Sequence, residues 1–150
     1  MPKPMAVCIE DLDARPGGPR YMRCVAVPGR QPGLRVSGRG EAIWQSEDGV
    51  ACELWVSADD RLILYRPEGA AAVTVRRAGR SLDCPFAKPV VLIDQDQIDV
   101  GGRRLRVHVH GEAPAVVAPS LYDPKASRVG NLTRAATVAA ALGTALAAGA

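Results

Sequence analysis

Pro89–Gly111 reads PVVLIDQDQIDVGGRRLRVHVHG, and this stretch decides the fold class. In its second half Leu105, Val107 and Val109 alternate strictly with arginines and histidines, which is the period of a half-buried strand. Its first half carries β-branched residues on both sides of a polar break at residues 94–97, and Gly101-Gly102 tolerates the positive φ angles of a two-residue turn. The stretch therefore predicts two strands that face each other across a tight turn.

The same stretch resembles the closing strands of a forkhead-associated (FHA) domain. Such domains commonly end in Leu-x-x-Gly-Asp-x-Ile-x-Ile-Gly and an alternating strand, and this chain has Leu92-x-x-Gln95-Asp96-x-Ile98-x-Val100-Gly101. Upstream, Gly38-Arg39 stands where the family has a Gly-Arg pair. The resemblance spans roughly residues 22–111 and implies one β-sandwich.

The rest of the chain agrees with an all-β fold. Strand-like runs recur about every ten residues, the rhythm of a sandwich or barrel, and the 15 Gly and 12 Pro suit many turns. The runs cover residues 5–9, 21–27, 34–37, 41–45, 50–57, 62–66 and 73–77, with a further strand beginning at 81. Hydrophobic residues make up 47% of the chain and aromatic residues 4%, so the core is expected to be aliphatic.

Four segments are predicted. Residues 1–20 form an N-terminal extension or first strand, 21–111 the FHA-like β-sandwich, 112–130 a Pro-rich linker and 131–150 an alanine-rich C-terminal helix. Asn131 suits an N-cap, and alanine favours helix strongly. The sixteen residues from Ala135 onward lack charge, but as a helix they would span about 24 Å, short of the roughly 30 Å of a bilayer core. Because the N-terminus lacks the apolar run of a signal peptide, a cytoplasmic protein is expected.

The FHA resemblance implies a phosphothreonine site built by an Arg of the Gly-Arg pair, a Ser that begins a Ser-x-x-His motif, and an Asn in a later loop. Arg39 supplies the first, and a guanidinium suits phosphate because its donors form a planar fork. Val50 and Glu53 stand where the Ser and the His belong, and the loop of residues 67–72 has no Asn. We therefore expect Arg39 to be a solvated loop arginine, with a competent phosphopeptide site as the alternative.

Metal binding and catalysis are not predicted. His108 and His110 could chelate a cation from one strand face, but Arg104 and Arg106 share that face and their charge opposes one. Asp94 and its neighbouring aspartates lie in a turn in the FHA-like reading. The chain contains no Gly-x-Ser-x-Gly, P-loop or His-Glu-x-x-His motif. No cofactor, no metal site and no enzymatic activity are therefore expected.

The four cysteines, at 8, 24, 52 and 84, include no Cys-x-x-Cys pair of the kind that structural zinc sites use. Reduced thiols buried as small hydrophobes are the simplest expectation. An even count also leaves two disulfides open.

Protein binding is the predicted function. Arg76, Arg77 and Arg80 form a cluster that could hold an acidic partner, or simply a solvated face. Trp55 shares a strand face with Glu53, so it is expected on the outer side of the sheet, in contact with a partner or with the C-terminal segment.

The predicted activity is thus that of a non-catalytic adaptor or scaffold that binds another protein or a second copy, without phosphothreonine dependence. Nucleic acid is not expected as a partner, because acidic residues are interspersed along the chain and leave no continuous basic footprint. Two alternatives remain: a membrane-associated protein anchored through residues 131–150, and a phosphopeptide-binding signalling module. The small residues of that segment also suit close docking on a protein, which we favour over membrane anchoring.

Overall fold

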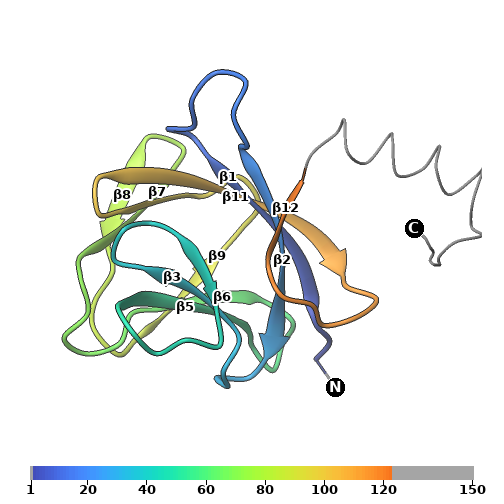
Figure 1. The fold of residues 1–150 in the computed structure, drawn as a ribbon. Helices are drawn as coiled ribbons and strands as arrows, with labels where there is room; N and C mark the ends of the chain where they lie inside the picture. Colours follow the sequence, from blue (N-terminus) through green and yellow to red (C-terminus); the bar gives the residue numbers. More distant parts are fainter. Residues whose placement is uncertain (1, 123–150) are drawn as a thin grey trace, which may run out of the picture.

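The computed structural model describes residues 2–122, and this part of the chain is all-β (Figure 1). Its twelve strands are β1 (Met5–Asp11), β2 (Tyr21–Pro28), β3 (Leu34–Ser37), β4 (Ala42–Trp44), β5 (Val50–Val56), β6 (Leu62–Tyr65), β7 (Val73–Arg77), β8 (Arg80–Asp83), β9 (Pro89–Leu92), β10 (Gln97–Val100), β11 (Arg103–Glu112) and β12 (Ser120–Tyr122). The strand runs predicted from the alternation of apolar residues are confirmed. The predicted C-terminal helix, residues 131–150, lies outside the described residues.

The strands form one mixed sheet in the order β4-β3-β5-β2-β1-β11-β10-β7-β8, with β6 and β9 continuing from β5. β2 joins its two parts: it pairs antiparallel with β1, and its last residues, Val27 and Pro28, run parallel to Trp55 and Val56 of β5. The sheet folds over so that β3, β5 and β6 lie in one layer and β1, β11, β7 and β8 in the other (Figure 1).

The core lies between these two layers and is aliphatic, as predicted. Leu54 of β5, Leu64 of β6 and Val107 of β11 are at most 1% exposed within it. From Cys52 onward β5 alternates as expected, with Cys52, Leu54 and Val56 in the core cluster and Trp55 half-buried on the opposite face. At the start of the strand the alternation fails: Ala51 is in the core cluster and Val50 is only half-buried, because the pairing with β3 shifts register at this point. Burial of such side chains is the main favourable term in folding.

The expectation for residues 89–111 needs a correction. Only β10 and β11 form the hairpin, with Ile98 opposite Leu105 across the Gly101-Gly102 turn. β9 pairs instead with β6 in the other layer, so Val91 lies beside Ile63. The reason is the polar break at residues 94–97, which begins with a tight turn rather than a continued strand. The amide of Asp96 donates to the carbonyl of Ile93, and the turn redirects the chain from one layer to the other.

The Pro-rich linker predicted for residues 112–130 also differs from the structure in its first part. Glu112 belongs to β11, and Ser120–Tyr122 return as β12, which pairs with residues 21–23 of β2. Residues 113–122, here called the strap, therefore lie against the sheet. Ala113 is buried at the start of the strap, and its amide donates to the carbonyl of Pro4 at 2.9 Å. The remainder of the predicted linker lies outside the described residues.

The N-terminal segment forms a first strand rather than a loose extension, because β1 lies between β2 and β11 in the sheet. Residues 2–122 include no helix of the length and apolarity needed to cross a bilayer. All four cysteines are free thiols; Cys24, Cys52 and Cys84 are buried, and Cys8 is half-buried.

Candidate functional site

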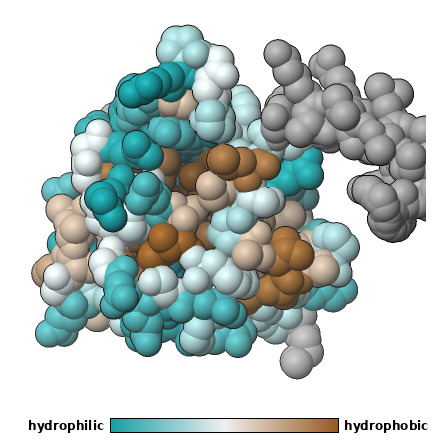
Figure 2. Space-filling view, viewed as in Figure 1, coloured by the Kyte–Doolittle hydropathy of each residue, from teal (hydrophilic) through white to brown (hydrophobic). Residues whose placement is uncertain are grey.

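A groove of about 720 Å³ lies between the strap and the outer face of β1, β2 and β11. Its walls are largely apolar, with Ala6 and Val25 on the sheet side and Ala113, Pro114, Ala115 and Val117 on the strap side. Figure 2 shows apolar patches that interrupt a mostly polar face on the side where β2 and β12 lie. The groove exists because the strap crosses this face before it joins the sheet edge as β12.

One arginine and two histidines line the groove. They are Arg23, His108 and His110, and no aspartate or glutamate lines it. The Arg23 guanidinium lies 4.3 Å from the centre of the Tyr122 ring, a cation–π contact that ties β2 to the strap. The strap is thus held at both ends, by this contact and by the buried Ala113.

His108 is fixed from two sides. Its Nε2 lies 2.9 Å from Oε1 of Glu10, and its Nδ1 lies 3.0 Å from Nε2 of Gln95. Because both ring nitrogens have partners, the imidazole is a positioned part of the wall rather than a free base or a free metal ligand. Within residues 2–122 no group of three or more His, Cys, Asp or Glu side chains gathers in a way that could hold a metal ion.

Cys8 is the cysteine that faces the groove while remaining half-exposed. It lies opposite His108 in the β1–β11 register. Burial raises the pKa of the Cys8 thiol, and the nearby Glu10 carboxylate raises it further. The group is therefore a neutral thiol at physiological pH, which argues against a nucleophilic role, since the thiolate is the reactive form.

The loop that carries Arg39 meets other loops at one end of the fold. The Gly38 amide donates to the Gly49 carbonyl at 2.8 Å. The Arg39 side chain is 90% exposed, and its nearest carboxylate is that of Glu41, at 3.9 Å. This is the solvated loop arginine that the sequence predicts, without the partners that would orient it toward a phosphate.

The positions expected to complete a phosphothreonine site serve other purposes. Val50 has no hydroxyl, and the Glu53 carboxylate accepts hydrogen bonds from Arg30 at 2.8 and 3.3 Å. A hollow of about 360 Å³ beside these loops is lined by three carboxylates and two arginines: Glu47, Glu53, Glu68, Arg30 and Arg35. Glu47 and Glu68 carry charge of the same sign as a phosphate, and the Arg30 guanidinium is already bound to Glu53.

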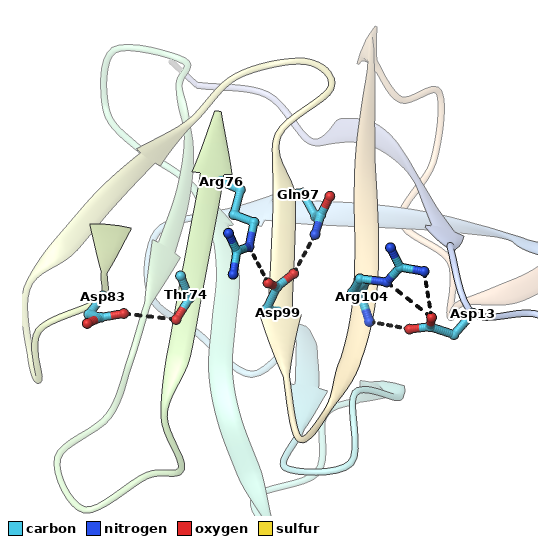
Figure 3. Close-up of polar contacts among 7 residues, drawn as sticks. All are labelled: Asp13, Thr74, Arg76, Asp83, Gln97, Asp99 and Arg104. Carbon is cyan, nitrogen blue, oxygen red and sulfur yellow. Dashed lines mark hydrogen bonds and ion pairs between the residues drawn. The ribbon is translucent and has the colours of Figure 1, made fainter. Parts of the chain in front are cut away.

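The predicted arginine cluster divides between two roles. Arg76 pairs with Asp99 at 2.6 Å, and Figure 3 shows Gln97 bound to the other oxygen of the same carboxylate. Arg77 binds the buried Asp96 through two hydrogen bonds. Arg80, on the exposed strand β8, forms no ion pair with any described residue. Arg76 and Arg77 are therefore engaged within the fold, and only Arg80 is left to meet an acidic partner.

Trp55 lies on the outer face of β5, as predicted, but away from the groove. Its ring centroid is 6.4 Å from that of Tyr65, which is itself covered by the Arg30 guanidinium at 4.0 Å. The indole Nε1 is buried and has no hydrogen-bond partner among the described residues. The half-buried tryptophan is thus part of a packed surface cluster.

No protein-family model, curated protein or solved structure matches this chain. The groove was not predicted from the sequence, because one of its walls is the strap, which the prolines at 114 and 119 suggest is a linker. The apolar side chains of the strap, such as Ala113, Ala115 and Val117, are the signal that could have indicated a segment lying on the sheet.

Proposed function

We propose that this chain is a non-catalytic protein-binding module, an adaptor or scaffold, in which the groove along the strap binds an apolar segment of a partner protein. The groove itself carries the proposal: about 720 Å³ of mostly apolar wall with a few positioned polar groups. Such concave, apolar surfaces with convergent polar groups are typical binding sites.

The surroundings of the groove favour a peptide segment over a small molecule. Val116, Val117 and Leu121 on the strap are 50%, 53% and 57% exposed. Val117 lines the groove, and Val116 and Leu121 add exposed apolar surface on the same strap beyond it. Exposed apolar surface of this kind marks protein interaction sites. The Arg23 guanidinium in the wall further favours a segment that carries an acidic residue, since complementary charge steers encounter.

We further propose that the scaffold is an FHA-like β-sandwich. Three features support the resemblance. Asp96 of the quoted motif is 1% exposed and fixes the turn before β10. Gly101 of the same motif packs against the carbonyl of Gly38, so the motif and the Gly38-Arg39 loop are in contact. The loop of Arg39 and the loop that ends at Gly49 converge at one end of the fold.

Binding by this module is proposed to be independent of phosphothreonine. The exposed Arg39 stands alone, Val50 offers no hydroxyl, and the loop end carries the carboxylates of Glu47 and Glu68. One charged contact without hydrogen-bonding partners gives little specificity for phosphate.

The test is a selection from two displayed peptide libraries against the full chain. One library has random sequences, and the other has a fixed phosphothreonine. The proposal expects binders with several apolar residues from the random library, whose affinity is unchanged by Arg39→Ala. Enrichment of phosphothreonine peptides only, with binding abolished by Arg39→Ala, would contradict it and support the phosphopeptide alternative.

A further inference from the structure

We infer that the partner segment binds the groove in an extended conformation and adds to the open edge of β2 at Val25, by hydrogen bonds between its own backbone and the N–H and C=O of that residue. The inference rests on the proposed binding role of the groove. It deepens that role by naming the class of ligand: a strand of a partner protein, recognised through its main chain as well as its side chains.

The hydrogen bonds of β2 show which of its residues face β1. In an antiparallel pair, residues whose N–H and C=O bond to the neighbouring strand alternate with residues whose groups point away from it. The Asp11 amide donates to the Arg20 carbonyl at 2.7 Å, so these two residues form a bonded pair. Counted in twos along the β1–β2 register, the bonded residues of β2 are Met22, Cys24 and Ala26. The residues between them direct their backbone groups to the opposite edge: Tyr21, Arg23, Val25 and Val27.

Val25 is the member of this second set that has no strand beside it. On the opposite edge β12 pairs with residues 21–23, and β5 pairs with residues 27 and 28. The amide of Gly29, which belongs to the same alternate set, donates to β5 at 2.8 Å and so supports the assigned direction. Val25 falls between β12 and β5, and no described strand pairs with it on this edge.

The strap leaves this edge before it reaches Val25. Continued by two residues, the β12–β2 register would place Ala118 opposite Val25, but β12 begins at Ser120 and the residue before it is Pro119. Val117 of the strap lines the groove instead, and so does Val25, which is 5% exposed. The groove therefore reaches β2 at the residue whose outward backbone groups have no strand beside them.

An extended segment is the ligand that matches these groups. Nearly all buried backbone N–H and C=O groups in folded proteins are hydrogen-bonded, so an unpaired pair at a buried residue favours a ligand that supplies one acceptor and one donor. An added strand does this, whereas the backbone groups of a helix bond to one another. The edge from Arg23 to Val27 spans about 13 Å, which is enough for a short strand. The ligand residue opposite Val25 would share its face of the sheet, beside the mostly apolar wall of the groove.

The test uses an apolar peptide selected from the random library and examines its main chain one amide at a time. Each peptide bond in turn is replaced by an ester, which removes one N–H donor and keeps every side chain. We expect one internal ester to raise the dissociation constant for the full chain about tenfold, because the Val25 carbonyl loses its donor. Esters at the two adjacent positions are the matched controls, with changes within about threefold, because their N–H groups point away from β2.

Amide hydrogen exchange of the full chain, followed by NMR with and without saturating peptide, identifies the protein group involved. Exchange of the Val25 amide should slow at least about tenfold on binding, while the Cys24 and Ala26 amides, which bond to β1, change less than about twofold. Equal sensitivity at all ester positions or an unchanged Val25 amide overturns the inference, as does protection of β8, the exposed edge strand, in place of Val25.

The two proposals fail in different ways. A peptide that binds in the groove but shows either of these negative results leaves the binding function standing and removes only the pairing at Val25. A random library that yields no binder contradicts the binding function in its own experiment, and the pairing at Val25 is then rejected with it.

Discussion

Arg77 holds Asp96 by two hydrogen bonds, from Nε at 2.8 Å and from Nη2 at 2.6 Å, and the carboxylate is 1% exposed while the arginine side chain is 45% exposed. Nη2 also donates to the Val91 carbonyl at 2.9 Å, and the Ile93 amide donates to the carboxylate. One pair therefore connects β7, the end of β9 and the turn before β10.

Because Asp96 is buried and Arg77 is half exposed, replacing Arg77 should destabilise the fold more than replacing Asp96. Arg77→Met leaves the buried Asp96 carboxylate without its charged partner. The free energy of unfolding should therefore fall by about 3 kcal/mol, as when one partner of a buried pair is removed. Asp96→Asn still accepts from Ile93 and leaves an arginine that water reaches, so we expect a loss of about 1–2 kcal/mol. Urea unfolding of both variants measures the difference.

Arg76→Met is the matched control for that pair of variants. It removes an ion pair on the neighbouring residue, but the Arg76 side chain is 56% exposed and its partner Asp99 is 23% exposed. The cost should therefore stay below about 1 kcal/mol. The account of Arg77 would be wrong if Asp96→Asn cost as much as Arg77→Met, or if Arg76→Met matched either of them.

The two glycines of the β10–β11 turn should differ in their tolerance of alanine. Both have positive φ, +58° at Gly101 and +77° at Gly102, so each alanine carries a strain of about 1–2 kcal/mol. At Gly102 the added methyl group meets open space, whereas at Gly101 it would overlap the carbonyl oxygen of Gly38. We expect Gly101→Ala to lower the thermal midpoint clearly more than Gly102→Ala. Equal midpoints would show that the Gly101–Gly38 contact is not required.

The buried thiols predict a loss of stability at alkaline pH. Burial raises the pKa of Cys24 to about 12, so the folded state keeps this proton while the unfolded state, with an ordinary pKa near 9, releases it. The contribution is intact below about pH 9 and is lost as the pH rises toward 12, at about 1.4 kcal/mol per pH unit.

Urea unfolding at pH 8, 9 and 10 measures this dependence, with Cys24→Ala as the comparison. The variant is expected to be less stable than the wild type at pH 8, because a cavity forms, and to lose less stability between pH 9 and pH 10. Parallel pH profiles for the two proteins would mean that Cys24 contributes nothing to the alkaline loss.

Much of the fold could be predicted from alternation and turn residues. The strict pattern at Leu105, Val107 and Val109 identified β11, and the faces of β5 from Cys52 onward followed from the same rule. The pairing partner of the residues before the polar break could not be predicted. Residues 94–97 read equally well as an interruption within one strand. In the structure the Asp96 amide bonds the Ile93 carbonyl, Arg77 holds the buried Asp96 carboxylate, and β9 pairs in the other layer.

The candidate site was harder to predict than the fold, because no single residue marks it. Arg39 and Trp55 are chemically conspicuous in the sequence, yet one is solvated and the other is packed beside Tyr65. The groove instead arises from ordinary alanines and valines that a tertiary contact brings together. The pairing of Ser120–Tyr122 with β2 is such a contact, and nothing local in the strap specifies it.

The central claim, that the groove is the binding surface, is tested most directly by two neighbouring valines. Val116 and Val117 are 50% and 53% exposed on the same strap, but only Val117 lines the groove. Aspartate at either exposed position should change the free energy of unfolding by less than about 0.5 kcal/mol.

The measurement is the dissociation constant of a library-selected apolar peptide for the full chain, by calorimetry, with wild type, Val116→Asp and Val117→Asp. The account predicts binding at least about tenfold weaker for Val117→Asp, a loss of about 1.4 kcal/mol, and no more than about a twofold change for Val116→Asp. Equal dissociation constants for the two variants would contradict the claim that the partner binds in the groove.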